Sequence, residues 1–134
     1  LEEQVALIGA LPQEKVMEYY LKSWVFCLPC VTTSDDNHDG LPNVIVEAMA
    51  TGLPVVTTDN AGQVELIEDE KHGFLVSQYS PVEIADAIQK MCTDFETWKI
   101  IQYQARKRIE DDFDSQKTNE PLFDLLKNAN KISV

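Results

Sequence analysis

Positive charge is scarce in this 134-residue sequence, which carries 11 lysines and arginines against 23 aspartates and glutamates, for a net charge of −12. Such an excess of negative charge repels the phosphates of nucleic acids and the headgroups of anionic membranes. The basic residues that are present cluster at 99–108 and 127–131. Neither a nucleic acid nor an anionic membrane surface is therefore an expected partner.

Cysteine is also scarce, with three residues in the chain. Cys27 and Cys30 match the Cys-x-Pro-Cys spacing of redox proteins, in which the pair opens a helix whose N-terminus lowers a thiol pKa. Here the residues after Cys30 are β-branched and polar, with no helix signal before Asn43. Reduced cytosolic thiols are thus favoured, and a thiol-disulfide protein that uses this pair stays as an alternative. The third cysteine, Cys92, lies in a predicted helix, so no four-ligand metal set is expected.

Long apolar runs, internal repeats and low-complexity segments are absent. No run approaches the roughly 20 apolar residues of a membrane helix, and the N-terminus lacks the charged-then-apolar pattern of a signal peptide. We therefore expect a cytoplasmic protein. Hydrophobic residues make up 44% of the sequence, which suits one domain over residues 1–134 with a core of its own. The first residue is Leu1 rather than methionine, from which we expect a fragment or an excised domain.

Short apolar runs alternate with segments of helical spacing along the chain. Strands are predicted at 5–9, 24–28, 54–58 and 73–76. Helices are predicted at 13–22, 43–51, 63–68, 81–92, 95–110 and 119–130. This alternation indicates an α/β fold, with a Rossmann-like, mostly parallel sheet flanked by helices. Ser80 and Glu83 form a predicted capping box, and His72, in a turn, is expected to face solvent.

The strongest local signals lie in residues 39–58. Gly40 and Pro42 mark a turn before a short helix, and Gly52 falls where a left-handed cap would end that helix. The residues at 55–58 are all β-branched, which is typical of a strand buried on both faces. The sequence therefore predicts a turn, a helix, a second turn and a buried strand in succession.

A ligand-binding site is predicted at the start of this helix. Backbone N–H groups of residues 40–44 would point out of the helix N-terminus, between the carboxylates of Asp39 and Glu47. This arrangement suits a phosphate, with two acceptors nearby for sugar hydroxyls. The polar run 35–39 lacks the glycine and the distal glutamate of a calcium loop, so we interpret it as a solvated insertion and expect no metal.

Residues 39–56 resemble the nucleotide-sugar-binding signature of retaining GT-B glycosyltransferases of the group 1, or family 4, type, which build bacterial polysaccharides. The family pattern is Glu-Gly-x-Pro-x-x-x-x-Glu-Ala-x-Ala-x-Gly-x-Pro-Val-Val, and the chain departs from it only in having Asp39 for the first glutamate. A second family pattern, Gly-Gly-x-Pro-Glu, is matched in part by Ala-Gly-Gln-Val-Glu at 61–65. The resemblance extends over roughly residues 5–115.

The resemblance implies that this chain is the C-terminal donor-binding domain of such an enzyme. The chain would be an incomplete C-terminal half of the GT-B fold. The implied reaction is transfer of a sugar (hexosyltransferase type) from a nucleoside diphosphate sugar, with retention, to a glycan or lipid-linked acceptor. The catalytic carboxylates implied are Glu47, which would contact the ribose, and Asp39, which would contact the donor sugar. The donor-binding residues implied are Gly40, Leu41, Pro42, Asn43, Val44, Gly62 and Gln63. No metal and no cofactor besides the donor is implied.

The same resemblance places other parts of the enzyme outside this sequence. The acceptor site would belong to an N-terminal domain, which could also hold the enzyme at the inner face of the membrane. Arginine and lysine contacts to the diphosphate would precede residue 1, so we expect the chain alone to bind nucleotide weakly and to transfer nothing. A non-catalytic nucleotide-sugar-binding or interaction module is the alternative.

The four predicted strands would be the third to sixth of a six-stranded sheet ordered 3-2-1-4-5-6. The first two strands of that sheet would lie between 5–9 and 24–28. The gap leaves three possibilities: another chain completes the sheet, strand 5–9 pairs differently, or the fragment is only marginally stable.

Overall fold

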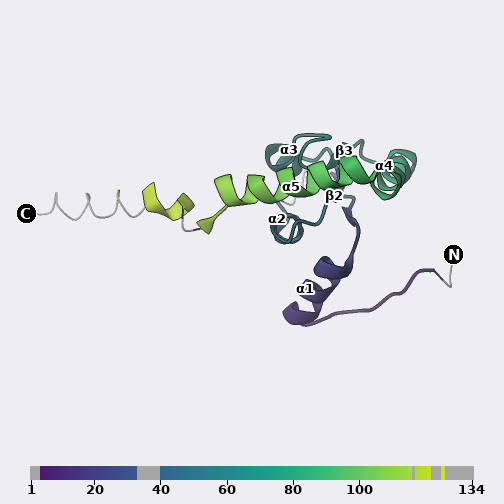
Figure 1. Ribbon diagram of the computed structural model, residues 1–134, viewed down its shortest axis with the longest axis horizontal. Helices are drawn as coiled ribbons and strands as arrows, with labels where there is room; N and C mark the ends of the chain where they lie inside the picture. The colour runs from purple at the N-terminus through teal and green to yellow at the C-terminus, as the bar shows by residue number, and fades with distance from the viewer. Residues whose placement is uncertain (1–3, 33–39, 116, 122–124, 126–134) are drawn as a thin grey trace, which may run out of the picture.

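The computed structural model describes residues 4–32, 40–115, 117–121 and 125 (Figure 1). In this part of the chain the elements are, in order, α1 (Gln13–Lys22), β1 (Phe26–Leu28), α2 (Asn43–Ala50), β2 (Val55–Thr58), α3 (Ala61–Leu66), β3 (Phe74–Val76), α4 (Pro81–Thr93) and α5 (Phe95–Asp112). Each lies within about two residues of its predicted position. Most of the predicted helix 119–130 falls outside the described residues.

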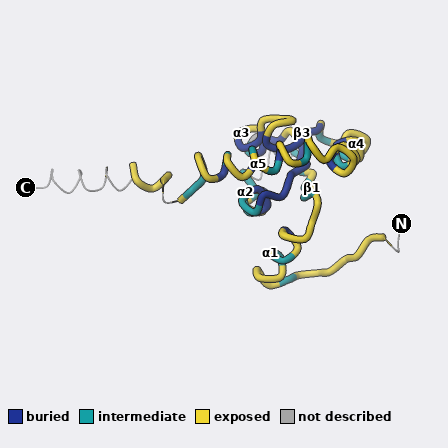
Figure 2. Tube along the Cα trace, in the orientation of Figure 1, coloured by how far each residue is buried: buried dark blue, intermediate teal, exposed yellow. Residues whose placement is uncertain are grey.

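The strands form one parallel sheet in the order β1-β2-β3. Phe26 pairs with Val55 and Val56 pairs with Phe74, which places β2 in the centre. All four residues of β2 are buried, as its β-branched composition predicts (Figure 2). The predicted α/β fold class, a Rossmann-like parallel sheet flanked by helices, is confirmed.

The core consists of two clusters, one on each face of the sheet. Successive strand residues point to opposite faces, so Val55 packs with α2 while Val56 packs with α4. The long helix α5 contributes to both clusters, through Ile101 on the α4 side and Ala105 on the α2 side. Helix α5 therefore joins the two halves of the core.

The predicted strand at 5–9 is wrong. In the structure these residues belong to no strand and are exposed, and the side chain of Leu7 is 98% accessible. The segment runs along the N-terminal side of α1, away from the sheet (Figure 1). A strand satisfies its backbone groups only beside a neighbour, and within the described residues 5–9 meets none. Of the three possibilities raised by the gap in the sheet, a different pairing of 5–9 is therefore excluded for this part of the chain.

Two helix ends show how the local signals work. Gly52 has the predicted left-handed backbone, with φ of 77°, and ends α2. The predicted capping box of α4 is wrong in detail, because the Ser80 side chain makes no cap hydrogen bond to the helix. Glu83 instead accepts a hydrogen bond from the N–H of Ser77 at 2.8 Å, and contacts with Ser77 and Ser80 lower the pKa of Glu83.

An aromatic stack lies next to the start of β1. The rings of Trp24 and Trp98 are stacked with centroids 4.6 Å apart, and Phe95 stacks on both. The indole of Trp98 donates to the Trp24 carbonyl at 2.8 Å, and that of Trp24 donates to the Met91 carbonyl at 3.1 Å. The stack attaches the start of α5 to the segment before β1.

None of the described helices combines the length with the apolar composition that crossing a bilayer requires.

Candidate functional site at the start of α2

The site predicted from the sequence begins with the turn that leads into α2. The core-facing residues Ile45, Ala48 and Met49 are fully buried and fix this helix against the sheet. Pro42 occupies the N-cap, and its carbonyl accepts a hydrogen bond from Ile45 N–H at 3.0 Å. Val44, in the first turn, is exposed. The positive end of the helix dipole and its first N–H groups therefore lie where a ligand can reach them.

Gly62 brings the second predicted motif to the same place. A Cβ on Gly62 would lie 2.6 Å from the Leu41 nitrogen, 2.8 Å from the Gly40 carbon and 2.9 Å from the Gly40 oxygen. These distances are shorter than van der Waals contact, so only glycine permits this approach. The start of α3 and the turn before α2 are thus in backbone contact, although Gly62 is 21 residues from Leu41 and 22 from Gly40.

Gln63 has an unusual environment beside this contact. Its side chain is fully buried, yet neither Oε1 nor Nε2 has a hydrogen-bond partner among the described residues. Buried amides are nearly always paired, because leaving one unpaired costs about 1–3 kcal/mol. Gln63 therefore adds unused hydrogen-bonding capacity to the candidate site.

Glu47 lies one turn into α2 and is half-buried. Its Oε2 accepts a hydrogen bond from the Tyr20 hydroxyl, with the oxygens 3.3 Å apart. Burial, the Glu47 charge and this hydrogen bond all raise the pKa of Tyr20. The sequence analysis assigned Tyr20 no role, because nothing in the local sequence indicates a partner 27 residues away.

The other predicted carboxylate, Asp39, lies outside the described residues, as does the rest of the polar run 35–39. The structure therefore places the predicted residues 40–44, 62 and 63 together, with Glu47 on the same helix, and leaves the position of Asp39 a prediction. Within the described ranges, no group of three or more His, Cys, Asp or Glu side chains is arranged to hold a metal ion.

The cysteines do not resemble a redox pair. None of the three forms a disulfide, and Cys27 lies within β1 rather than at a helix start. Burial raises the pKa of the Cys27 thiol. A redox-active thiol needs a lowered pKa, because the thiolate is the nucleophile. The environment of Cys27 therefore argues against the thiol-disulfide alternative.

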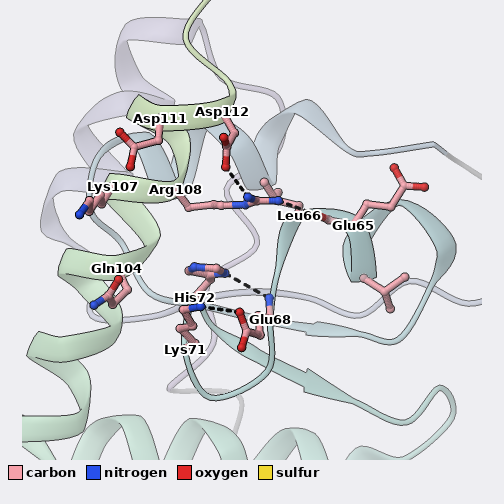
Figure 3. A pocket seen from close by; sticks show the side chains of 11 residues that line it. Glu65, Leu66, Glu68, Lys71, His72, Gln104, Lys107, Arg108, Asp111 and Asp112 are labelled. Atoms are coloured by element: carbon pink, nitrogen blue, oxygen red, sulfur yellow. Dashed lines mark hydrogen bonds and ion pairs between the residues drawn. The ribbon is translucent and has the colours of Figure 1, made fainter.

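A separate polar cavity of about 420 Å³ lies between α3, the turn after it and α5 (Figure 3). Its lining residues are Val64, Glu65, Leu66, Glu68, Lys71, His72, Gln104, Lys107, Arg108, Asp111 and Asp112. Opposite charges pair within it, with Glu68 bound to Lys71 at 2.6 Å and Arg108 bound to Asp112. None of the predicted donor-binding residues lines this cavity, so it is distinct from the candidate site.

His72 lines this cavity and is 8% exposed, so the expectation that it faces solvent is wrong. Its Nδ1 accepts a hydrogen bond from the N–H of Glu68 at 3.2 Å, which requires that nitrogen to be unprotonated (Figure 3). Burial lowers the pKa of His72, as do the charges of Lys71 and Arg108. The turn after α3 thus folds around a neutral imidazole.

We expect His72 to make the protein less stable in mild acid. Because its pKa is lower in the folded state, the unfolded chain binds more protons as the pH falls. The contribution of His72 is complete above its ordinary pKa of 6.5 and declines as the pH drops through the lower folded-state value. Urea unfolding at pH 7.5, 6.5 and 5.5 should show a smaller loss of stability in His72→Gln than in wild type. The same loss in both proteins would contradict the assignment, and His38→Gln is the control for the second histidine.

Comparisons with known proteins agree with the sequence signature. The family model of the group 1 glycosyl transferases matches residues 1–108. The putative colanic acid biosynthesis glycosyltransferase WcaL of Escherichia coli is 36% identical over 129 residues, covering 94% of this chain and 31% of that protein. The amylovoran biosynthesis glycosyltransferase AmsK of Erwinia amylovora is 31% identical, with the same coverage of both chains. The chain thus spans about a third of the length of the curated relatives it matches.

Solved structures agree in fold. Anabaena HepE, crystallised with UDP and glucose, matches 96% of this chain and 33% of its own, with a TM-score of 0.82 and 25% identity. Sucrose-phosphate synthase of Thermosynechococcus elongatus matches with a TM-score of 0.81 at 23% identity, which shows the fold alone. The chain therefore belongs to the group 1 glycosyl transferases.

Proposed function

We propose that this chain is the donor-binding part of a retaining glycosyltransferase that takes a sugar from a nucleoside diphosphate sugar. The observation that carries the proposal is the contact of Gly62 with Gly40 and Leu41, which joins the start of α3 to the turn before α2, at the exposed start of α2. Glu47 stands one turn further along the same helix. A helix N-terminus with a carboxylate beside it suits a phosphate linked to a sugar that bears hydroxyls.

Each group has a role in this proposal. Backbone N–H groups within 40–44, of which Pro42 has none, bind the diphosphate. Glu47 accepts hydrogen bonds from the ribose hydroxyls. Gly62 and Gln63 lie on the other side of the donor, and Asp39 contacts the sugar of the donor. When the glycosidic bond breaks, negative charge grows on the leaving diphosphate, and the fixed dipole of α2 stabilises that charge without a metal ion.

The acceptor in this proposal is a glycan or a lipid-linked sugar bound by a further domain of a cytoplasmic enzyme, which can be peripheral to the membrane. The names of WcaL and AmsK, which place those proteins in polysaccharide biosynthesis, support this class of acceptor. The UDP and glucose in the HepE crystal support a nucleotide sugar as donor. The proposal expects weak nucleotide binding and no transfer from this chain alone.

The test is an NMR titration of the chain with UDP, GDP and ADP, repeated with Glu47→Gln. Wild type should show saturable shifts at 39–47 and 60–65. Glu47→Gln should bind about tenfold more weakly, because each hydrogen bond to a charged group contributes about 1.5–3 kcal/mol and the amide loses part of this. Asp39→Ala should change the discrimination between donor sugars more than the affinity for the nucleotide.

The matched control is Glu14→Gln, the same change at an exposed glutamate of α1. Its affinity should equal that of wild type. Shifts outside the named segments, or equal affinities for Glu47→Gln and Glu14→Gln, would reject the site. A full-length enzyme that binds the nucleotide but transfers no sugar would favour the non-catalytic module instead.

A further inference from the structure

Tyr20 is the one described residue of α1 that is buried, at 6% exposure, while its neighbour Tyr19 is 49% exposed. Its ring meets Phe26 of β1 edge to face, with centroids 5.7 Å apart. This packing fixes the ring, so the hydroxyl has a defined position. That position is beside the Glu47 carboxylate, 3.3 Å from Oε2.

Glu47 has no other side-chain partner in the part of the chain that the structure describes. The recorded salt bridges of lysines and arginines go to other carboxylates. A glutamate side chain has three rotatable bonds and loses conformational freedom when a ligand fixes it. A hydroxyl that already holds Oε2 removes part of that cost and leaves Oε1 open to accept a further hydrogen bond.

We propose that Tyr20 is a positioning residue that holds Glu47 in the orientation in which its carboxylate accepts hydrogen bonds from the ribose hydroxyls of the donor. This inference rests on the proposed function of Glu47. It gives α1 a part in recognition of the donor, although α1 contributes no group to the predicted donor-binding set. Tyr20 acts through Glu47, and it contacts no ligand itself.

The test compares Tyr20→Phe with Tyr19→Phe, the same change at the adjacent, exposed tyrosine. Tyr20→Phe keeps the ring that packs on Phe26 and removes only the hydroxyl. The probes are UDP and 2′-deoxy-UDP, the corresponding guanosine and adenosine diphosphates with their 2′-deoxy forms, and pyrophosphate. A role confined to packing would change all affinities alike, whereas a positioning role changes the preference for the ribose over the deoxyribose.

We expect Tyr20→Phe to bind UDP about three- to tenfold more weakly than wild type and to lose most of its preference over 2′-deoxy-UDP. Its affinity for pyrophosphate should not change. Tyr19→Phe should match wild type with every probe. In a Glu47→Gln background, Tyr20→Phe should have little further effect, since the two residues act as one unit.

Two results would overturn the inference, and only one of them would also overturn the proposed function. If Glu47→Gln loses affinity while Tyr20→Phe behaves like Tyr19→Phe, Tyr20 does not position Glu47 and the proposed function stands. If Glu47→Gln itself binds as wild type does, both proposals fail together.

The contact can also be checked without a ligand. Because the Glu47 charge contributes to the raised pKa of Tyr20, Glu47→Gln should lower that pKa in an NMR titration of the tyrosine ring. The Tyr19 resonance in the same sample is the internal control. An unchanged Tyr20 titration would mean that the carboxylate and the hydroxyl do not interact.

Discussion

Replacing Gly62 by alanine is expected to destabilise the protein and to abolish nucleotide binding together. The new methyl group would overlap backbone atoms of Gly40 and Leu41 at 2.6–2.9 Å. Backbone atoms cannot rotate away as a flexible side chain does, so the turn before α2 or the start of α3 must move. Alanine gains up to about 1 kcal/mol of helix propensity over glycine, but overpacking costs typically 1–3 kcal/mol. We therefore expect a net loss of stability.

The measurement is urea unfolding followed by a UDP titration under conditions where both proteins are folded. Gly40→Ala is the control for stability, because a Cβ on Gly40 has no atom within 4 Å. Gly62→Ala should unfold at lower urea and bind no UDP at concentrations that saturate wild type. If Gly62→Ala were as stable as Gly40→Ala and bound UDP normally, the contact between the start of α3 and the turn before α2 would have no role in the site.

A second large effect is expected at Ile101 of α5, which is fully buried, while the adjacent Ile100 is 59% exposed. Ile101→Ala leaves a cavity in the cluster that packs α4 and α5 on the sheet, and such truncations cost about 2–5 kcal/mol. Ile100→Ala removes the same atoms at the surface, where substitutions stay within about 0.5 kcal/mol. The free energies of unfolding of the two variants should therefore differ by at least about 1.5 kcal/mol.

Equal losses in the two isoleucine variants would mean that α5 is not packed on the sheet as described. The comparison holds residue type, helix and sequence position nearly constant. Burial is then the variable that separates the two variants. The outcome consequently tests the packing of α5 independently of the donor site.

Local signals were sufficient to predict most elements of this fold. The β-branched run that forms β2 and the left-handed Gly52 depend on neighbours in sequence, and both are confirmed. The apolar run 5–9 has the composition of a strand, but a strand also needs a pairing partner, which composition does not reveal. His72 has the sequence context of an exposed turn, yet the turn folds over it and buries the ring.

The residues of the candidate site also fall into those that the sequence predicts and those that it does not. The sequence signature identified the turn at 40–44, Glu47 and Gly62 as one site, and the structure brings Gly62 onto Gly40 and Leu41. The Tyr20 contact and the unpaired amide of Gln63 depend on how distant helices pack, so no sequence pattern indicated them. Residues whose role comes from position along the chain were thus predictable, whereas those whose role comes from packing were not.

The stacked indoles near the start of β1 have a practical consequence for spectroscopy. The chain has two tryptophans, and they lie against each other as one coupled pair of chromophores. Their emission and near-ultraviolet dichroism therefore report one location, the docking of α5 onto the segment before β1. The start of α2 follows β1 at the opposite end of the strand. We therefore expect optical signals from these indoles to monitor folding rather than events at the donor site.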